Sequence, residues 1–184
     1  ELNGSTVESS TGAVTMHGEG GAFAAGTQQA GISLVTSTVE SDSGTIDLTA
    51  IGGSGGNSMA LLFWNGSEVR SRDNGTIILT GTGTGSGVDL YSGRSVGGTA
   101  VSKIGNHVDP VKAGNIVLKI NTTNWASENT SFQSDGTFTI QPRTVGTTVG
   151  IAGGSGTLNL SLDRINAIQD GFSEIIIGNE TAGN

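Results

Sequence analysis

The chain has 184 residues, 32 of them glycine and none cysteine, with a formal net charge of −8 at neutral pH. This charge, with no basic stripe to displace counterions from phosphates, argues against nucleic-acid binding, and no apolar run is long enough for membrane insertion. Only 2 prolines accompany the glycines, which follow no triplet period, so a collagen-like fold is excluded and one domain over residues 1–184 is expected.

The N-terminal half repeats one pattern three times. The copies read STVESSTGAVTMHGEGG at residues 5–21, STVESDSGTIDLTAIGGSGG at residues 37–56 and SEVRSRDNGTIILTGTGTGSG at residues 67–87. Each contains a valine, a serine two places later, a glycine and a glycine-rich exit. The period of roughly 30 residues is typical of solenoids, in which each repeat stacks on the next. Because the chain opens inside a repeat, we expect it to be a segment of something longer.

Within each copy, apolar and polar residues alternate, which predicts strands with one buried face. We expect about three short strands per repeat: one ahead of the valine, one around it and one after the glycine. Stacked repeats would align their apolar residues in three buried columns. These columns are Val7, Val39 and Val69; Val14, Ile46 and Ile77; and Met16, Leu48 and Leu79.

The strands ahead of the valines are expected at residues 31–34, 62–64 and 88–90. The strand at residues 88–90 predicts a fourth copy of the pattern, in which Val96 is the first valine. In the strand at residues 62–64, we expect Trp64 to point inward in register with Leu34, which leaves Phe63 pointing outward. Exposed aromatic side chains on a thin coil are candidate contacts for a ligand or a neighbouring protomer.

The pattern loosens after about residue 100, so we divide the domain into regular repeats over 1–100, looser coils with excursions over 101–150 and a terminal module over 151–184. Residues 103–110 are predicted as a loop, and residues 115–120 and 137–140 as strands. The polar stretch 122–134 is predicted as an excursion that Trp125 and Phe132 pin to the coil. The alternative for this pair is an exposed platform for sugar.

The terminal module is predicted as strand, helix and strand. Residues 158–160 form the first strand, and Ser161 caps a helix over 162–169 whose apolar face holds Leu162, Ile165 and Ile168. Gly171 ends the helix in a left-handed conformation, and residues 174–177 return as a strand.

The charged residues predict no catalytic, cofactor or metal site. Glu8, Glu40 and Arg70 should stack on the outer face, where the charge of Arg70 offsets the repulsion between the two glutamates. The alternative is a divalent cation bound between the two carboxylates. Asp42 and Asp73 fall at turns, where aspartate is first of all a turn former. His17 and His107 lack partners at ligand spacing and are expected at the surface or in loops.

The segment VRSRDNGTIILTG, Val69–Gly81, and the module Gly156–Gly178 resemble repeats of the filamentous-haemagglutinin-like and autotransporter adhesins of Gram-negative bacteria. The resemblance implies a right-handed parallel β-helix that forms the shaft of an exported adhesin. We therefore expect an all-β, right-handed parallel β-helix (β-solenoid) of about five to six coils, with a short helix-containing insert near the C-terminus.

The expected function is a structural shaft or presentation segment of a secreted or cell-surface fibre, located outside the cell or on the bacterial surface, and not an enzyme. Two alternatives stay open: a self-assembling extracellular filament protomer, and a carbohydrate-binding or polysaccharide-cleaving β-helix. Expected partners are neighbouring solenoid coils or protomers, with host or matrix glycans as further candidates, and no cofactor is expected.

Overall fold

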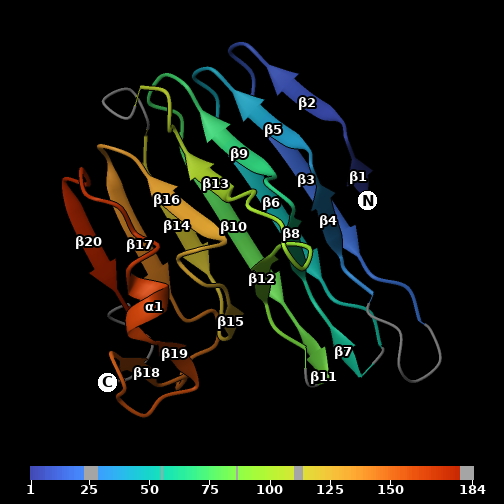
Figure 1. Ribbon diagram of the computed structural model, residues 1–184, viewed down its shortest axis with the longest axis vertical. Coiled ribbons are helices and arrows are strands. Elements are labelled where there is room, and N and C mark those ends of the chain that lie inside the picture. Colours follow the sequence, from blue (N-terminus) through green and yellow to red (C-terminus); the bar gives the residue numbers. More distant parts are fainter. Residues whose placement is uncertain (23–28, 55, 86, 110–113, 179–184) are drawn as a thin grey trace.

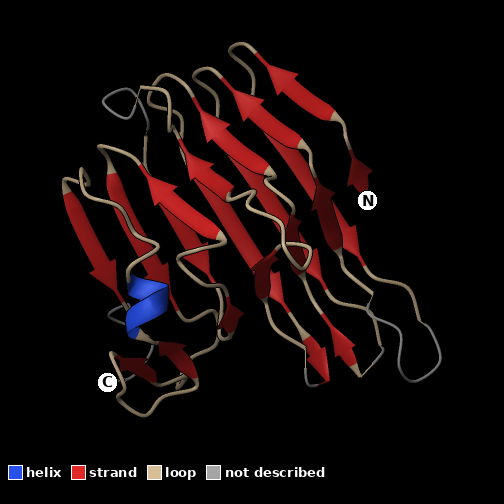
Figure 2. Cartoon of the chain, in the orientation of Figure 1, coloured by secondary structure: helices blue, strands red, loops and turns tan. Residues whose placement is uncertain are grey.

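The computed structural model describes residues 1–22, 29–54, 56–85, 87–109 and 114–178. It confirms an all-β class, with almost no helix, and parallel sheets that form a β-solenoid of about four turns (Figures 1 and 2). From β1 in the first turn to β15 in the last, the chain returns four times to the same sheet, in the order β1-β4-β8-β12-β15.

Three parallel sheets, which we call A, B and C, run through the described residues. Sheet A contains β1 (Leu2–Asn3), β4 (Ile32–Val35), β8 (Leu61–Trp64), β12 (Leu90–Gly93) and β15 (Thr123–Asn124). Sheet B contains β2 (Thr6–Ser9), β5 (Thr38–Ser41), β9 (Glu68–Ser71), β13 (Ser102–Gly105) and β16 (Thr130–Gln133). Sheet C contains β3 (Val14–Glu19), β6 (Ile46–Ile51), β10 (Ile77–Thr82), β14 (Ile116–Lys119), β17 (Thr137–Gln141) and β20 (Glu174–Ile177).

Two small strand pairs lie beside the three sheets. The antiparallel pair joins β7 (Asn57–Ser58) to β11 (Thr84–Gly85), and the parallel pair joins β18 (Val149–Ile151) to β19 (Leu158–Leu160). One short helix, α1 (Leu162–Ile165), follows β19 and is the only helix in the described part of the chain. One rung, meaning one pass through sheets A, B and C, therefore corresponds to one copy of the sequence repeat.

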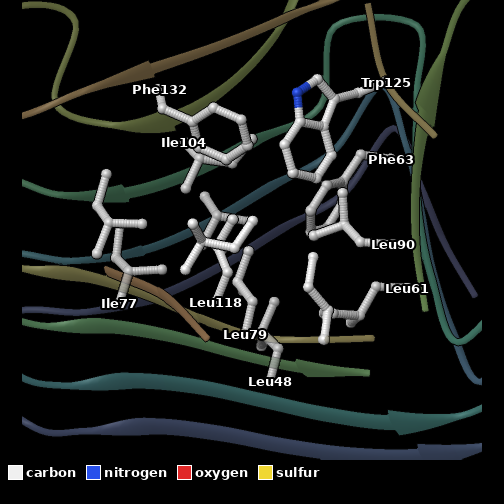
Figure 3. Close-up of a cluster of buried hydrophobic side chains, with 14 of the residues drawn as sticks. Leu48, Leu61, Phe63, Ile77, Leu79, Leu90, Ile104, Leu118, Trp125 and Phe132 are labelled. Carbon is white, nitrogen blue, oxygen red and sulfur yellow. The ribbon is translucent and has the colours of Figure 1, made fainter. Parts of the chain in front are cut away.

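The three predicted columns are present, and later rungs extend them. Val7, Val39 and Val69 are in register in sheet B, and Ile104 and Phe132 continue that column. In sheet C, the other two columns run from Val14 to Ile175 and from Met16 to Ile177. Figure 3 shows side chains from the three sheets meeting in the interior, among them Leu48, Phe63 and Ile104. The hydrophobic core is therefore one stack through the solenoid.

The serine and glycine of the repeat form the corner between sheets B and C. The amides of Gly12 and Gly44 donate to the hydroxyls of Ser9 and Ser41, at 3.0 and 2.9 Å. The Ser41 hydroxyl also donates to the Gly12 carbonyl of the rung before, at 3.1 Å. A Cβ on Gly44 would lie 2.1 Å from the same carbonyl oxygen, so no larger residue fits there. The motif is thus explained by a corner that touches the corner below it.

The same glycine column continues beyond the repeats that the sequence displays. A Cβ on Gly75 would meet the Gly44 carbonyl oxygen at 2.3 Å, and one on Gly114 would meet that of Gly75 at the same distance. Gly136 is the last glycine of the column, and a Cβ added to it would lie 2.7 Å from the Gly114 carbonyl oxygen. The corner therefore persists where the spacing of the sequence repeat is lost.

The fourth rung differs from the prediction. Val96 does not head it: this side chain is fully exposed, at 107% of its reference area, and Ile104 takes the column position next to Val69. The predicted loop at 103–110 is also wrong at its start, since residues 102–105 form β13; Pro110 lies outside the described residues. The extra residues of this rung bulge outward between β12 and β13, so the strand begins later than the period predicts.

The predicted excursion at 122–134 is wrong as well, because it contains β15 and β16. Trp125 and Phe132 are buried, at 3% and 0% exposure, and their rings meet edge to face at 5.2 Å. Both side chains lie in the core, so there is no excursion for this pair to pin, and a sugar platform formed by them is excluded. The stretch reads as polar although it is strand, because two of its inward positions are taken by the buried residues Thr123 and Thr130, beside Phe132.

The terminal module keeps its predicted order, but its helix is shorter. Strands β19 and β20 are present, Gly171 has the expected positive φ of 122°, and the Ser161 hydroxyl accepts from the Arg164 amide at 3.4 Å. The helix ends at Ile165 because Ile168 bridges to Phe132 and extends sheet B. Leu162, predicted on the apolar face, is 64% exposed.

Candidate functional site

Sheet A presents aromatic side chains on its outer face. Strands β4, β8 and β12 pair so that Leu34 is in register with Phe63, and Val35 with Trp64. Phe63 is therefore buried, at 1% exposure, and Trp64 lies outward and half-buried, the reverse of the prediction. The predicted register was one residue off, which turns every side chain of a strand to the opposite face.

Tyr91 on β12 is the neighbour of Trp64. Tyr91 pairs with Leu62, and Trp64 pairs with Gly93, so the two aromatic residues are diagonal neighbours on one face. Their ring centroids lie 6.1 Å apart and the ring planes differ by 23°. A Cβ on Gly93 would come within 2.6 Å of the indole and 2.7 Å of the phenol ring. The absence of a side chain at Gly93 is thus what allows both rings to lie across the strand.

A groove of about 400 Å³ runs beside these rings; we call it the Trp64–Tyr91 groove. The residues that line it are Glu1, Ser33, Val35, Met59, Leu62, Trp64 and Tyr91. An adjoining hollow of about 450 Å³ adds the polar side chains of Glu19 and Gln29; it shares Glu1, Ser33, Met59 and Leu62 with the groove. Apolar and aromatic walls with a few polar groups at one end are typical of ligand-binding grooves.

The charged ladder on the outer face of sheet B is as predicted in its register. Glu8, Glu40 and Arg70 are consecutive along the ladder, and Arg70 Nε lies 2.5 Å from Glu40 Oε2. Arg72, which was not included in the prediction, adds a contact from Nη2 to Glu40 Oε1 at 2.9 Å. Arg70 also contacts Glu68, Nη1 to Oε2, at 3.0 Å.

Glu40 is the buried member of this ladder, at 7% exposure. Burial alone would raise the pKa of the Glu40 carboxyl, but hydrogen bonds and charge from Arg70 and Arg72 lower it below its ordinary value. Both guanidinium groups pair with Glu40, whereas Glu8 faces a hollow of about 300 Å³ that Glu40, Asp42 and Arg72 also line. The ladder is therefore a structural ion-pair network.

A second buried carboxylate, Asp89, was not singled out in the sequence. It is 4% exposed and accepts from the amides of Gly83 and Asn121, both at 2.5 Å, and from that of Thr122 at 3.3 Å. Gly83 lies in the same connection between β10 and β12 as Asp89, and the other two donors lie in the equivalent connection one rung later. The acceptor capacity of Asp89 is used to hold the backbone at a corner, which is a structural task.

The remaining candidate groups are spread over different faces. Asp47 stacks between Thr15 and Ile78 and accepts a hydrogen bond from Thr49 at 3.1 Å. His17 is exposed. His107, expected at the surface or in a loop, lies in the loop after β13 and is half-buried, with Nε2 at 3.0 Å from the Ser131 hydroxyl.

Burial lowers the pKa of His107 to about 4, with a smaller contribution from the charge of Lys103. Among the described residues, no group of three or more His, Cys, Asp or Glu residues is placed to hold a metal ion. The same part of the chain contains no helix long and apolar enough to cross a membrane.

No protein-family model, no curated protein and no solved structure matches this chain. The Trp64–Tyr91 groove is the feature that the sequence reading missed. Residues Leu61 to Trp64 are all apolar, so the sequence held no signal for which of them faces outward; that follows only from the register of β4, β8 and β12.

Proposed function

We propose that this chain is a structural shaft, or presentation segment, of an adhesin-like fibre located outside the cell or on the bacterial surface. The supporting observation is the apolar column of sheet C, which passes through every rung without a break. Each rung buries its apolar faces only against its neighbours, so such a stack forms a rod whose stability is shared along its length. The column consists of Val14, Ile46, Ile77, Ile116, Phe138 and Ile175.

The finer architecture belongs to the same proposal. We take the coil as right-handed, because parallel crossover connections almost always have this hand. With each strand counted as one coil, sheets of five and six strands correspond to five to six coils, and the module containing α1 is an insert near their end. A catalytic role is not part of the proposal.

Imaging and labelling test the shaft directly. The purified chain should appear as dispersed short rods even at high concentration, and antibodies against it should label intact cells of the source organism. Labelling only after permeabilisation would contradict the surface location. Cleavage of a polysaccharide that one Asp or Glu substitution abolishes would contradict a purely structural role.

A filament protomer is the second candidate, favoured by the state of β20. This strand is the last of sheet C, and Ile175 and Ile176 are 52% and 39% exposed. The free edge of β3 in a second copy would place Val14 next to Ile175 and continue the column. Long filaments with the repeat of one protomer, dispersed by Ile175→Lys, would favour this candidate over the shaft.

A further inference from the structure

We propose that the Trp64–Tyr91 groove binds a neutral glycan chain, whose pyranose rings stack on the two aromatic side chains. The inference rests on the presentation role proposed above and gives that role a ligand class and a place. It starts from the position of the residues: Trp64 and Tyr91 lie on the outer face of sheet A, while Phe63 and Leu90 of the same strands fill the core.

The arrangement of the two rings suits a sugar. A centroid distance of 6.1 Å at 23° is too long for one ring to cover the other, so part of each face stays available. The rings belong to adjacent rungs, which are about 4.8 Å apart, so together they form a strip across two rungs. The C–H face of a pyranose is flat and apolar, and aromatic faces are the side-chain surfaces that complement it.

Part of this arrangement is explained without a ligand, by the need to cover Gly93. Aromatic side chains cover glycines in sheets, and both rings close over Gly93. Covering Gly93 does not require the groove that continues past the rings to Met59 and Leu62. Nor does it require the hydroxyl of Ser33, which lines both the groove and the hollow beside it.

The polar groups at the end of the groove decide between classes of glycan. Glu19 and Gln29, in the adjoining hollow, offer acceptors and an amide donor to sugar hydroxyls. A carboxylate there, in a chain of net charge −8, repels sulfated or sialylated glycans. The geometry and the charge together point to a neutral chain of hexoses, of which a β-1,4-linked glucose hexamer is a suitable probe.

Tryptophan fluorescence is a natural readout, because Trp64 is half-buried and Trp125 is 3% exposed. Titration with cellohexaose should change the emission saturably and protect Trp64 from acrylamide quenching. Calorimetry then compares variants. Trp64→Leu and Tyr91→Leu keep an apolar cover over Gly93 but remove the flat faces, and each should weaken binding at least about tenfold. Ile78→Leu, on the outer face of sheet C, should leave the affinity unchanged.

Three results would overturn the proposal: no saturable binding of cellohexaose up to millimolar concentration, equal binding by Tyr91→Leu, or tighter binding of a heparin hexamer than of cellohexaose. Thermal unfolding of each variant shows whether the Leu side chain preserves the fold. If Trp64→Leu does not fold, the affinity of Tyr91→Leu decides the question. Surface labelling with no glycan binding would reject this inference and leave the shaft intact. Recovery of shortened sugars would instead contradict the presentation role.

Discussion

The solenoid has a regular part, from β1 to β10, and an irregular part, from β12 to β20, and both keep the same columns. In the regular part, 32 residues separate Val7 from Val39 and 30 separate Val39 from Val69. In the irregular part, 39 residues separate Leu79 from Leu118, and 22 separate Leu118 from Ile140. The fold therefore conserves the inward side chains and the glycine corner, and lets the connections vary in length.

The largest effect expected is that of a charge in the column, and it should be equal in the two parts. Ile46→Asp and Ile116→Asp would each bury an unpaired carboxylate at a fully buried position, and each should destabilise the fold by at least about 4 kcal/mol. Denaturant unfolding measures this, with Thr49→Asp, on the half-buried outer face, as the mild control. A severe effect at Ile46 with a mild one at Ile116 would mean that the irregular part does not share the core.

The next largest effect is expected from substitutions of the corner glycines, which also compare the regular part with the irregular part. Gly75→Ala places a Cβ at 2.3 Å from the Gly44 carbonyl oxygen, and Gly136→Ala places one at 2.7 Å from that of Gly114. We expect losses of about 3 kcal/mol and about 2 kcal/mol, in that order. Gly56, where an added Cβ meets nothing within 4 Å, supplies the control. Equal stability of Gly75→Ala and Gly56→Ala would show that the corner is looser than the contacts indicate.

The ion pairs of Glu40 lie in the regular part and give it an acid sensitivity. Because the pKa of Glu40 is lower in the folded state than its ordinary 4.5, its stabilisation is complete above that pH and is lost as the pH falls through the folded value. Glu40→Gln should cost about 1–3 kcal/mol at pH 7, since the Arg70 and Arg72 side chains are 25% and 50% exposed and partly solvated. The variant should also flatten the loss of stability below pH 4.5, as followed by unfolding midpoints.

His107 gives the irregular part a sensitivity in a higher pH range. Its pKa falls from an ordinary 6.5 to about 4 on folding, so between these values the unfolded chain binds the proton more readily. Stability should thus decrease as the pH falls from 6.5 to about 4, by about 1–2 kcal/mol after allowance for partial exposure. His107→Gln should remove this slope while leaving that of Glu40. The same slope in both proteins would assign the effect to another group.

The smallest effect expected lies in the bulge that makes the fourth rung irregular. Val96→Ser changes a fully exposed side chain and should shift stability by less than about 0.5 kcal/mol. Ile104→Ala, in the column position that the period assigned to Val96, should cost about 2–5 kcal/mol. Comparable losses in the two variants would restore the register predicted from the period.

The sequence was sufficient for the fold where local pattern and period agreed. Val39, Ile46 and Leu48 alternate with polar residues, and apolar residues recur at the same positions one period later. The strands, their buried faces and the stacked columns could therefore be predicted from the sequence. Ile104 and Phe132 escaped prediction because their place depends on which residues bulge outward, a choice that packing makes across rungs. Trp64 was misplaced for the same reason: Leu62, Phe63 and Trp64 are all apolar, so the alternation carried no information about the face.

The candidate site was less predictable than the fold. Arg70 could be placed next to Glu40 because both lie within the regular copies, and Arg72 follows two positions later on the same face. Tyr91 and Gly93 lie in the fourth rung, and their relation to Trp64 exists only once β8 and β12 are in register. Groups that meet across rungs, as those around Asp89 do, have no signature in the order of the residues.

The Ser–Gly corner bears on how such a chain changes length over generations. The Ser41 hydroxyl contacts the Gly12 carbonyl below, and the Gly44 carbonyl meets Gly75 above, so a rung offers to its successor the surface that it takes from its predecessor. A rung duplicated in frame therefore inserts between existing neighbours without any new complementary surface. Unequal recombination within such a gene would lengthen or shorten the rod in whole rungs, and selection could adjust reach separately from stability.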